Sequence, residues 1–372
     1  MRKIGIVTHY YNSVNYGGVL QAYALCRFLN DKGYFAEQIC VDKASNGRVV
    51  KRVLKNILEI IRHCFHFKEY KNINKRKKAF VDFRENSIPH TSTVYKEDDL
   101  CIISEKYDIF ITGSDQVWHP NAVCNAYLLD FPSSKRKISY AASVATEELS
   151  DMEKEKYRKA LKKFSAISVR EKNGVSLIQP LVSLPVYWVV DPVFLLTKNE
   201  WKSIKKDRII ETNGKYIFSF FLGGGEIYRN LTKEFAQLKK LKIVTLPYLE
   251  NDYRHCDKDF GDVKLFDVSP KELLSLIEGA EYVFTDSFHV TAFSIIFEKQ
   301  FFVFERNSSL KMESRIYSLT DLFNLNNRFF NNMNVLNIEQ LLNIEDIVYK
   351  NKQKDFYKMK QKSIDFLMQN IE

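Results

Sequence analysis

Apolar and polar positions alternate along the first half of the chain in the pattern of a parallel α/β domain. An apolar run predicts a buried strand over residues 3–8, a polar loop follows, and apolar spacing predicts a helix over 19–29. A second strand is expected over 35–41. This strand-loop-helix-strand order is typical of parallel sheets, in which helices connect neighbouring strands. Further strands of this half are expected over 107–112, 138–143 and 166–169, and residues 188–192 close it.

The second half repeats this alternation. Strands are expected over 216–221, 243–246, 282–286 and 301–304, and helices over 231–241, 270–277, 290–297 and most of 338–368. We therefore predict two Rossmann-like α/β domains, residues 1–192 and 193–335, which face each other across a cleft. A C-terminal helical segment, 336–372, follows them. Ligands of such sheets bind beyond the carboxyl ends of the strands.

One segment, about residues 48–95, interrupts the alternation. Its apolar residues recur at helical spacing with Lys and Arg between them, which predicts one or two basic amphipathic helices inserted into the first domain. Residues 51–78 contain ten Lys or Arg and two Glu, so this segment carries +8 of the net charge of +10. The rest of the chain is nearly neutral, which argues against a surface that coats nucleic acid. His63 and His66 lack an acidic partner close in sequence, so no metal site is predicted.

Composition indicates a globular protein, since 45% of the 372 residues are hydrophobic and 27% are charged. No apolar stretch approaches the roughly 18 residues of a transmembrane helix. The apolar run at the start of the chain is too short for a secretory signal. Six cysteines show no disulfide spacing. A cytoplasmic protein with reduced thiols is therefore expected.

Candidate chemistry lies just after the strand ends. The strand over 282–286 runs directly into a helix, where Ser287 is a natural N-cap and His289 falls in the first turn. The start of that helix offers free N–H groups to an anion. The residues alone leave a second interpretation open, in which Ser287 is an ordinary capping residue and His289 is structural.

Basic side chains follow other strands. Arg170 comes directly after the strand over 166–169 and could pair with a phosphate or carboxylate, or instead with neighbouring Glu171. Lys311 and Arg315 are four residues apart and share one face of a helix, which could face a ligand or solvent.

Two polar loops complete the set. Asp115 lies on a tight turn after the strand over 107–112, where a carboxylate could accept a proton from a sugar hydroxyl or form an Asx turn. Residues 15–18 contain two glycines but match neither a dinucleotide-binding nor a P-loop pattern, so they indicate only a close backbone approach.

Taken together, these motifs resemble the polysaccharide pyruvyl transferase family from about residue 4 to residue 325. The resemblance rests on Asn15-Tyr16-Gly17-Gly18-Val19-Leu20-Gln21-Ala22-Tyr23, Gly113-Ser114-Asp115-Gln116-Val117-Trp118, Ser139-Tyr140-Ala141-Ala142-Ser143, Ser168-Val169-Arg170-Glu171, Asp191-Pro192, Asp286-Ser287-Phe288-His289 and Lys311-Met312-Glu313-Ser314-Arg315-Ile316. It implies a glycosyltransferase-B-like fold, phosphoenolpyruvate as donor, and a sugar acceptor that becomes a cyclic pyruvate ketal.

The resemblance also implies roles for individual residues. Arg170, His289 and Lys311 match donor contacts, and Ser287 stands at the helix start beside them. Many members carry Ser-x-Arg-Leu-His where this chain has no arginine, so Arg315 is our candidate for the missing positive charge.

Catalysis and acceptor binding complete these expectations. His289 is expected to act as general acid and Asp115 as general base, with Glu171 as the alternative base. For acceptor binding we expect Asn15, Tyr16, Gly17, Asp115 and Trp118.

The expected substrates follow from the same resemblance. No cofactor is expected, because phosphoenolpyruvate is a co-substrate. The expected acceptor is a hexose such as galactose, ketalated at O4 and O6, in a capsular or exopolysaccharide precursor on polyprenyl diphosphate. Residues 51–78 would then rest on the anionic inner face of the plasma membrane. The alternatives are a glycosyltransferase of the same fold that uses a nucleotide sugar, and a non-catalytic binder of nucleic acid or anionic surfaces built around residues 51–78.

Overall fold

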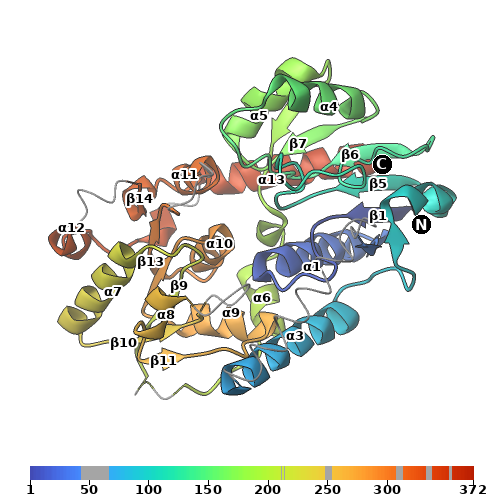
Figure 1. The fold of residues 1–372 in the computed structure, drawn as a ribbon. Helices are drawn as coiled ribbons and strands as arrows, with labels where there is room; N and C mark the ends of the chain where they lie inside the picture. The colour runs from blue at the N-terminus through green and yellow to red at the C-terminus, as the bar shows by residue number, and fades with distance from the viewer. Residues whose placement is uncertain are drawn as a thin grey trace.

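The computed structural model describes residues 1–42, 67–210, 212, 214–247, 254–306, 313–331, 337–351 and 354–372. These residues form two α/β units, each built around a parallel sheet, with the first unit at the upper right of Figure 1 and the second at the lower left. The predicted fold class, two Rossmann-like units of parallel α/β structure, is confirmed.

The sheet of the first unit has the strand order β2-β1-β5-β6, and all four strands are parallel. These strands are β1 (Lys3–Val7), β2 (Phe35–Gln38), β5 (Ile109–Thr112) and β6 (Arg136–Ser139). Single parallel bridges connect the region of β6 to that of β7 (Ile167–Val169), which pairs with β8 (Val186–Trp188). The parallel arrangement therefore extends from β2 to β8.

Helix α1 (Tyr16–Asp31) lies between the two units. Nearly all of its residues are buried, because it packs against the first sheet on one side and against α9 (Pro270–Gly279) and α10 (Phe288–Ile296) of the second unit on the other. The sequence therefore shows an almost continuous apolar run instead of a one-sided stripe. The other helices of the first unit are α4 (Asp151–Leu161) and α5 (Lys172–Ile178), with 3-10 turns η2 (Glu97–Lys106) and η3 (Gln179–Leu181).

The second unit has six parallel strands in the order β11-β10-β9-β12-β13-β14. Its strands are β9 (Tyr216–Phe220), β10 (Lys242–Thr245), β11 (Val263–Lys264), β12 (Tyr282–Thr285), β13 (Gln300–Phe304) and β14 (Phe329–Phe330). Besides α9 and α10, it contains α6 (Lys198–Ile204), α7 (Glu226–Lys239), α8 (His255–Lys258) and α11 (Glu313–Leu322), with 3-10 turns η4 (Pro192–Phe194) and η5 (Asn326–Arg328).

The end of the chain returns to the first unit. Helix α12 (Ile338–Leu342) packs against α7 of the second unit, whereas α13 (Lys354–Ile371) crosses to the first, and η6 (Tyr349–Asn351) precedes it (Figure 1). Ser363 Oγ accepts a hydrogen bond from the Val190 N–H at 3.0 Å, and Arg2 donates to the Ile371 carbonyl at 2.9 Å. The expected single helical segment over 336–372 is thus two helices that serve different units.

The basic segment is described in part. Residues 43–66 lie outside the described residues, and α3 (Phe67–Ser87) is one long helix that packs against α9. A short pair, β3 (Val41–Asp42) with β4 (Tyr95–Lys96), lies on either side of the segment. Within the part of the chain that the structure describes, no helix is long and apolar enough to cross a membrane.

Candidate functional site

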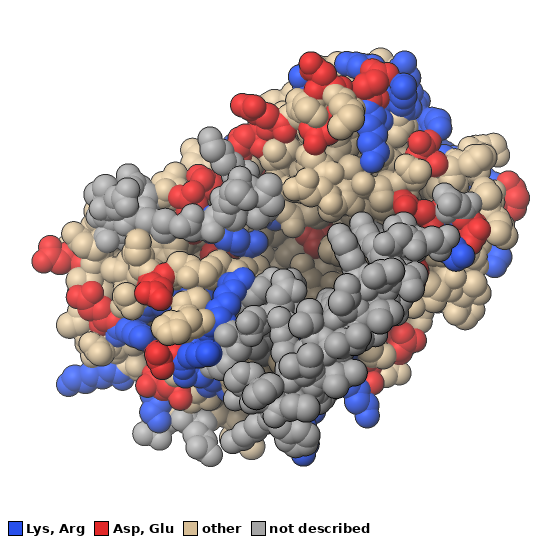
Figure 2. Space-filling model, in the orientation of Figure 1, with Lys and Arg blue, Asp and Glu red and all other residues tan. Residues whose placement is uncertain are grey.

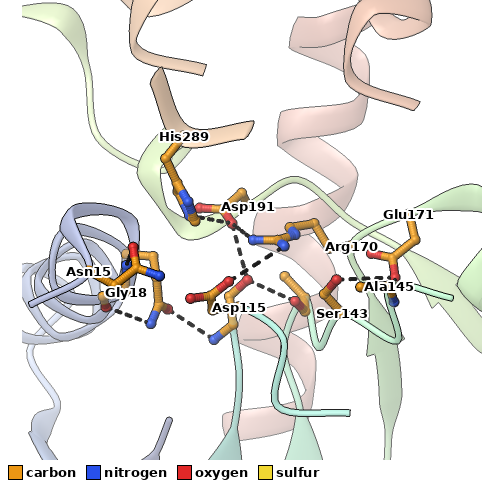
Figure 3. Close-up of polar contacts among 12 residues, drawn as sticks. Asn15, Gly18, Asp115, Ser143, Ala145, Arg170, Glu171, Asp191 and His289 are labelled. Atoms are coloured by element: carbon orange, nitrogen blue, oxygen red, sulfur yellow. Dashed lines mark hydrogen bonds and ion pairs between the residues drawn. The ribbon is translucent and has the colours of Figure 1, made fainter. Parts of the chain in front are cut away.

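The carboxyl ends of the strands of both units bring polar residues to the space between them. Asp115 follows β5, Arg170 follows β7 and Asp191 follows β8 in the first unit. Ser287 and His289 follow β12 in the second unit. Figure 3 shows Asp115, Arg170, Asp191 and His289 converging from these separate elements.

Asp191 accepts hydrogen bonds from several elements at once. Its Oδ2 accepts from Arg170 Nη1 at 2.8 Å and from Ser114 Oγ at 3.1 Å, and it lies 3.5 Å from His289 Nε2. Its Oδ1 accepts from the Val193 N–H at 3.1 Å, so Asp191 also caps the start of η4. Burial disfavours the charge, but His289 and Arg170 together hold the pKa of Asp191 well below its usual range. Asp191 therefore stays ionised and links the two units.

Arg170 is fully buried beside this carboxylate. Its guanidinium carbon lies 4.2 Å from the centre of the Phe288 ring, a cation–π contact made across the two units. Its Nη2 lies 3.7 Å from Asp115 Oδ1. Neither Nη2 nor Nε has a hydrogen-bond partner within the described residues. Arg170 thus keeps unused donors toward an anion.

Asp115 faces the same guanidinium. Burial raises the pKa of Asp115, but the charges of His289, Arg170 and His9 outweigh it and lower the pKa below the usual value. The carboxylate is therefore ionised at neutral pH and accepts protons only weakly.

The turn that carries Asp115 has a tight backbone. Gly113 has φ of 116°, and a Cβ there would lie 2.2 Å from the Tyr140 carbonyl oxygen, so only glycine fits. The N–H of the next residue, Ser114, donates to Gln21 Oε1 at 3.0 Å. These contacts fix Asp115 with respect to α1.

His289 packs against the N-terminus of α1. A Cβ added to Gly17 would lie 1.9 Å from His289 Nδ1, so the imidazole occupies the space of a side chain at that position. Asn15 caps the helix through Oδ1, which accepts from the Gly18 N–H at 3.3 Å. The need for glycine at position 17 is thus explained by His289 of the opposite unit, which fills the space of a side chain there.

A cavity of about 260 Å³ opens beside His289. Both units line it: Val14, Asn15, Tyr16, Gly17, Leu20, Arg76 and Gln116 come from the first, and Phe220, Leu222, Pro247, Leu273, Ser287, His289, Val290, Phe293 and Arg306 come from the second. Such a concave site, lined by both apolar and polar side chains from two units, is suited to binding a small molecule.

Comparison with known proteins identifies the family. A sequence model of the family described as polysaccharide pyruvyl transferase matches residues 15–308, which include the cluster and all of the lining of the cavity except Val14. The chain belongs to the polysaccharide pyruvyl transferase family. It is therefore a transferase that acts in polysaccharide synthesis. A search of curated proteins returned no match.

Solved structures support the fold of this pyruvyl transferase. A protein from Listeria monocytogenes, named as a UDP-N-acetylglucosamine 2-epimerase, is similar with a TM-score of 0.54 and 10% identity over 98% of this chain and 90% of that one. The UDP-GlcNAc 2-epimerase from Methanocaldococcus jannaschii gives a TM-score of 0.51 and 10% identity over 98% and 99% of the two chains. At this identity the similarity shows a glycosyltransferase-B-like fold alone.

The structure brings most of the predicted site residues of this pyruvyl transferase together. His289, Ser287, Asn15, Tyr16 and Gly17 line the cavity, while Asp115 and Arg170 lie in the buried cluster next to it. Arg315 is buried close by and borders a void of about 20 Å³ with Arg170, which has room for roughly one water molecule. Lys311 lies outside the described residues.

Three expectations need correction. Trp118 does not line the cavity, because its indole is fully buried, donates to the Tyr127 carbonyl at 3.1 Å and packs on Phe164. Glu171 does not line the cavity, and its carboxylate turns toward Ala145 (Figure 3), since Oε1 accepts from the N–H groups of Val144 and Ala145 at 2.7 and 2.9 Å.

The third correction concerns Ser287. It occupies the N-cap position of α10, but its side chain makes no capping hydrogen bond. Its N–H instead donates to Thr285 Oγ1 at 3.0 Å. The hydroxyl is therefore not used to cap the helix, and Ser287 lines the cavity.

Sequence reasoning assigned no role to three residues that the structure places in the site. Asp191 and Arg306 both follow strand ends, the same signal that pointed to Arg170, so they could have been found. Arg76 lies within a run of basic residues on α3, and nothing in the sequence distinguishes it from its neighbours. Among the described residues, no group of three or more His, Cys, Asp or Glu could hold a metal ion.

Proposed function

We propose that this pyruvyl transferase moves the pyruvyl group of phosphoenolpyruvate onto two hydroxyl groups of one sugar, forms a cyclic ketal and releases phosphate. Family membership supports pyruvyl transfer in polysaccharide synthesis. The position of His289 carries the proposal: the imidazole lines the cavity of about 260 Å³ and also lies 3.5 Å from Asp191 in the buried cluster. His289 can therefore exchange a proton with a ligand while the cluster holds its ring.

Surplus positive charge supports an anionic donor. Phosphoenolpyruvate carries a phosphate and a carboxylate, groups that arginine recognises well. Burial, together with the charges of Arg170 and Arg306, lowers the pKa of Arg315 to about 9. A bound anion would relieve this repulsion. Arg170, Arg306 and Arg315 are thus the proposed donor contacts, with Ser287 at the start of α10 and with Lys311.

The reaction begins with a proton on the donor. His289 gives its proton to C3 of phosphoenolpyruvate, and C2 becomes an electrophile with oxocarbenium character. A sugar hydroxyl then attacks C2, forms the first C–O bond and loses its proton. A second hydroxyl of the same sugar attacks C2, the C2–O bond to phosphate breaks, and inorganic phosphate leaves with the second proton. No oxidant or further co-substrate is required.

Asp115 is the proposed acceptor of the hydroxyl proton. Its carboxylate is ionised and lies in the cluster with His289. The next residue in the chain, Gln116, lines the cavity. The lowered pKa of Asp115 makes it a weak base, so proton transfer to it occurs as the C–O bond forms and not beforehand. Glu171 is poorly placed for this role because it faces the 143–145 turn.

The proposed acceptor is a hexose such as galactose, ketalated at O4 and O6, in a lipid-linked precursor of a capsular or exopolysaccharide. Asn15, Tyr16 and Gly17 line the cavity and are the proposed sugar contacts. The basic residues exposed on α3 support a peripheral position on the anionic inner face of the plasma membrane. The polyprenyl diphosphate carrier would then lie at that surface.

Acceptor-dependent phosphate release tests this function. The purified chain is incubated with phosphoenolpyruvate and a panel of hexosides, with His289→Ala as the matched inactive control. We expect release of phosphate with at least one acceptor and background release with the variant. If phosphoenolpyruvate stays intact while a UDP-sugar is consumed, the chain is a glycosyltransferase and the proposal is wrong.

A further inference from the structure

Helix α11 presents three polar side chains to the first unit. Arg315, Ser318 and Asp321 follow one another at intervals of three residues, which places them along one side of the helix. Arg315 and Ser318 are buried and border the void of about 20 Å³ next to Arg170. Helices α5 and α11 lie side by side across the two units (Figure 1). Arg315 of the second unit thus shares its side of the helix with two residues that can bind the first unit.

Both of these neighbours of Arg315 hold the first residue of α5. The Lys172 N–H donates to Ser318 Oγ at 3.2 Å, and the Lys172 ammonium forms an ion pair with Asp321 Oδ2. The hydrogen bond from Lys172 lowers the pKa of Asp321, so this carboxylate is ionised at neutral pH. We call the contacts of Lys172 with Ser318 and Asp321 the clasp. Since Lys172 comes two residues after Arg170, the clasp ties the segment of one arginine to the helix of the other.

The side chain of Lys172 also supports Arg170 within the first unit. Its Nζ lies 4.9 Å from the centre of the Trp188 ring, a cation–π contact. Trp188 Nε1 in turn donates to the Arg170 carbonyl at 3.0 Å. Trp188, Arg170, Arg315 and Ser318 all border the same void. One lysine therefore links the backbone of Arg170, through Trp188, with the helix that carries Arg315.

The two arginines need such a support because they repel each other. Burial, followed by the charge of Arg170, lowers the pKa of Arg315. The ion pair of the clasp is itself partly exposed, since 50% of the Lys172 side chain and 33% of the Asp321 side chain are accessible to solvent. Exposed pairs contribute little to the stability of a whole protein. The clasp is therefore better suited to fixing the local distance between Arg170 and Arg315 than to holding the fold together.

We propose that Lys172, Ser318 and Asp321 are positioning residues, which clasp α5 to α11 and hold Arg315 beside Arg170 before the donor binds. An anion then meets both cations in place and does not have to bring them together against their repulsion, so it binds more tightly. This inference deepens the proposed function and rests on it for the identity of the anion as phosphoenolpyruvate. The contacts of the clasp do not depend on that identity.

The test uses inorganic phosphate, the product of the proposed reaction, as the probe of the full-length chain. Calorimetry measures its affinity for the wild type, Asp321→Asn and Ser318→Ala. Loss of one contact of the clasp should weaken binding about threefold. Coulomb's law alone predicts the opposite for Asp321→Asn, because removal of a negative charge near an anion favours binding. The sign of the change therefore separates positioning from a direct effect of charge.

Charge reversal and an unrelated ion pair provide the controls. Asp321→Lys should weaken phosphate binding about tenfold, because repulsion replaces attraction in the clasp. The exchange of Lys172→Asp with Asp321→Lys should recover most of the affinity. Asp151→Asn removes an exposed pair of the same kind on α4, in which Lys154 Nζ lies 3.0 Å from Asp151 Oδ1, and should bind as the wild type does. Circular dichroism confirms that each variant is folded.

Steady-state kinetics gives a second readout, which a merely structural role would not produce. Asp321→Asn should raise the KM of phosphoenolpyruvate about threefold and affect kcat much less. The reason is that no residue of the clasp lines the cavity beside His289. An equal loss in kcat would show that the clasp supports the reacting groups and not the donor arginines.

Several results would overturn this inference. Unchanged phosphate affinity in Asp321→Asn would show that the arginines keep their places without the clasp, and tighter binding would show that the clasp opposes entry of the anion. No recovery in the exchanged pair would contradict an ionic clasp, and an equal loss in Asp151→Asn would assign the effect to net charge. If Asp321→Asn weakens phosphate binding while the wild type does not consume phosphoenolpyruvate, the proposed function is wrong and the clasp is still supported.

Discussion

The two α/β units bring opposite kinds of chemistry to the space between them. In the buried cluster, the first unit supplies two carboxylates and one arginine that attract each other, since Arg170 pairs with Asp191 at 2.8 Å and approaches Asp115 at 3.7 Å. The second unit supplies His289, Arg306 and Arg315. Figure 2 shows a few acidic atoms inside the hollow near the middle of the molecule and Lys and Arg atoms beside it.

The difference separates two tasks. The cluster of the first unit is held by its own ion pairs and fixes geometry, although Nε and Nη2 of Arg170 make no hydrogen bond among the described residues. In the second unit, burial and the charges of Arg170 and Arg306 lower the pKa of Arg315 to about 9, so an anion bound beside these arginines would be favoured. We infer that the anionic donor is bound mainly from the second unit and the acceptor hydroxyls are received by the first.

The largest expected effect is at His289, where the two units meet. Replacing it by alanine removes the proton donor to C3 and should lower kcat about a thousandfold, within the range of general acid catalysis. The melting temperature should change little, because the imidazole lines the cavity. Steady-state kinetics with phosphoenolpyruvate measures the effect, and a variant that keeps more than a tenth of wild-type kcat would contradict the assignment.

Asp191→Asn tests the contribution of the ion-paired cluster of the first unit to stability. It leaves the buried charge of Arg170 without its closest counter-charge, and we expect a loss of about 3–5 kcal/mol in the free energy of unfolding. Urea denaturation at neutral pH measures this loss.

The pH dependence gives a second readout for the same variant. The pKa of Asp191 is lowered in the folded state, so its contribution is present above the ordinary aspartate pKa of about 3.9 and is lost as the pH falls below it. The stabilities of wild type and Asp191→Asn should therefore converge in acid. A constant difference from pH 7 to the acid limit would show that Asp191 acts by shape and not by charge.

Gly17→Ala tests the contact between the units with a single methyl group. The new Cβ would lie 1.9 Å from His289 Nδ1, so the ring must move. A shift of about 1 Å at a reacting group predicts a loss of about a hundredfold in kcat/KM. Gly224→Ala is the matched control, because a Cβ there meets no atom within 4 Å, and it should keep wild-type activity. Equal activity of the two variants would mean that His289 is not held by α1.

The smallest effect is expected at Arg315. Arg315→Met removes a buried charge whose pKa is lowered, so folding no longer opposes its ionisation and the free energy of unfolding should rise by on the order of 1 kcal/mol. The same change should raise the KM of phosphoenolpyruvate about tenfold through loss of a charge-assisted contact. Thermal melting measures the change in stability, and steady-state kinetics with phosphoenolpyruvate measures the change in KM. A variant that is less stable and binds the donor normally would place Arg315 outside the donor site.

The fold class could be predicted because the pairing of strands in the two parallel sheets agrees with the local pattern of apolar residues. Apolar runs such as those of β1 and β12 are buried on both faces of parallel sheets, and the helices between them show 3.6-residue spacing. The helical structure expected over most of 338–368 is divided between two helices, since α12 ends at Leu342 and α13 begins at Lys354 and reaches the first unit. That crossing depends on tertiary packing, which local pattern does not contain.

Site residues could be predicted only where they directly follow a strand, because the carboxyl ends of parallel strands lie at one edge of the sheet. Arg170, Asp115 and His289 were found because each follows a strand end. Trp118 was misplaced because the loop turns its indole into the core, and the sequence carries no signal for the direction of a side chain in an irregular loop. The link between Gly17 and His289 spans the two units and could not be read from either segment alone.

Incubation with phosphoenolpyruvate labelled with carbon-13 in its methylene carbon tests the central claim most directly. The glycan product is analysed by mass spectrometry and carbon-13 NMR. We predict that the product gains one labelled pyruvyl group with loss of one water, that the label appears as a methyl carbon on a ketal, and that His289→Ala forms none. An unlabelled glycan, or a label that remains a methylene carbon in an enolpyruvyl ether, would contradict ketal-forming pyruvyl transfer at this site.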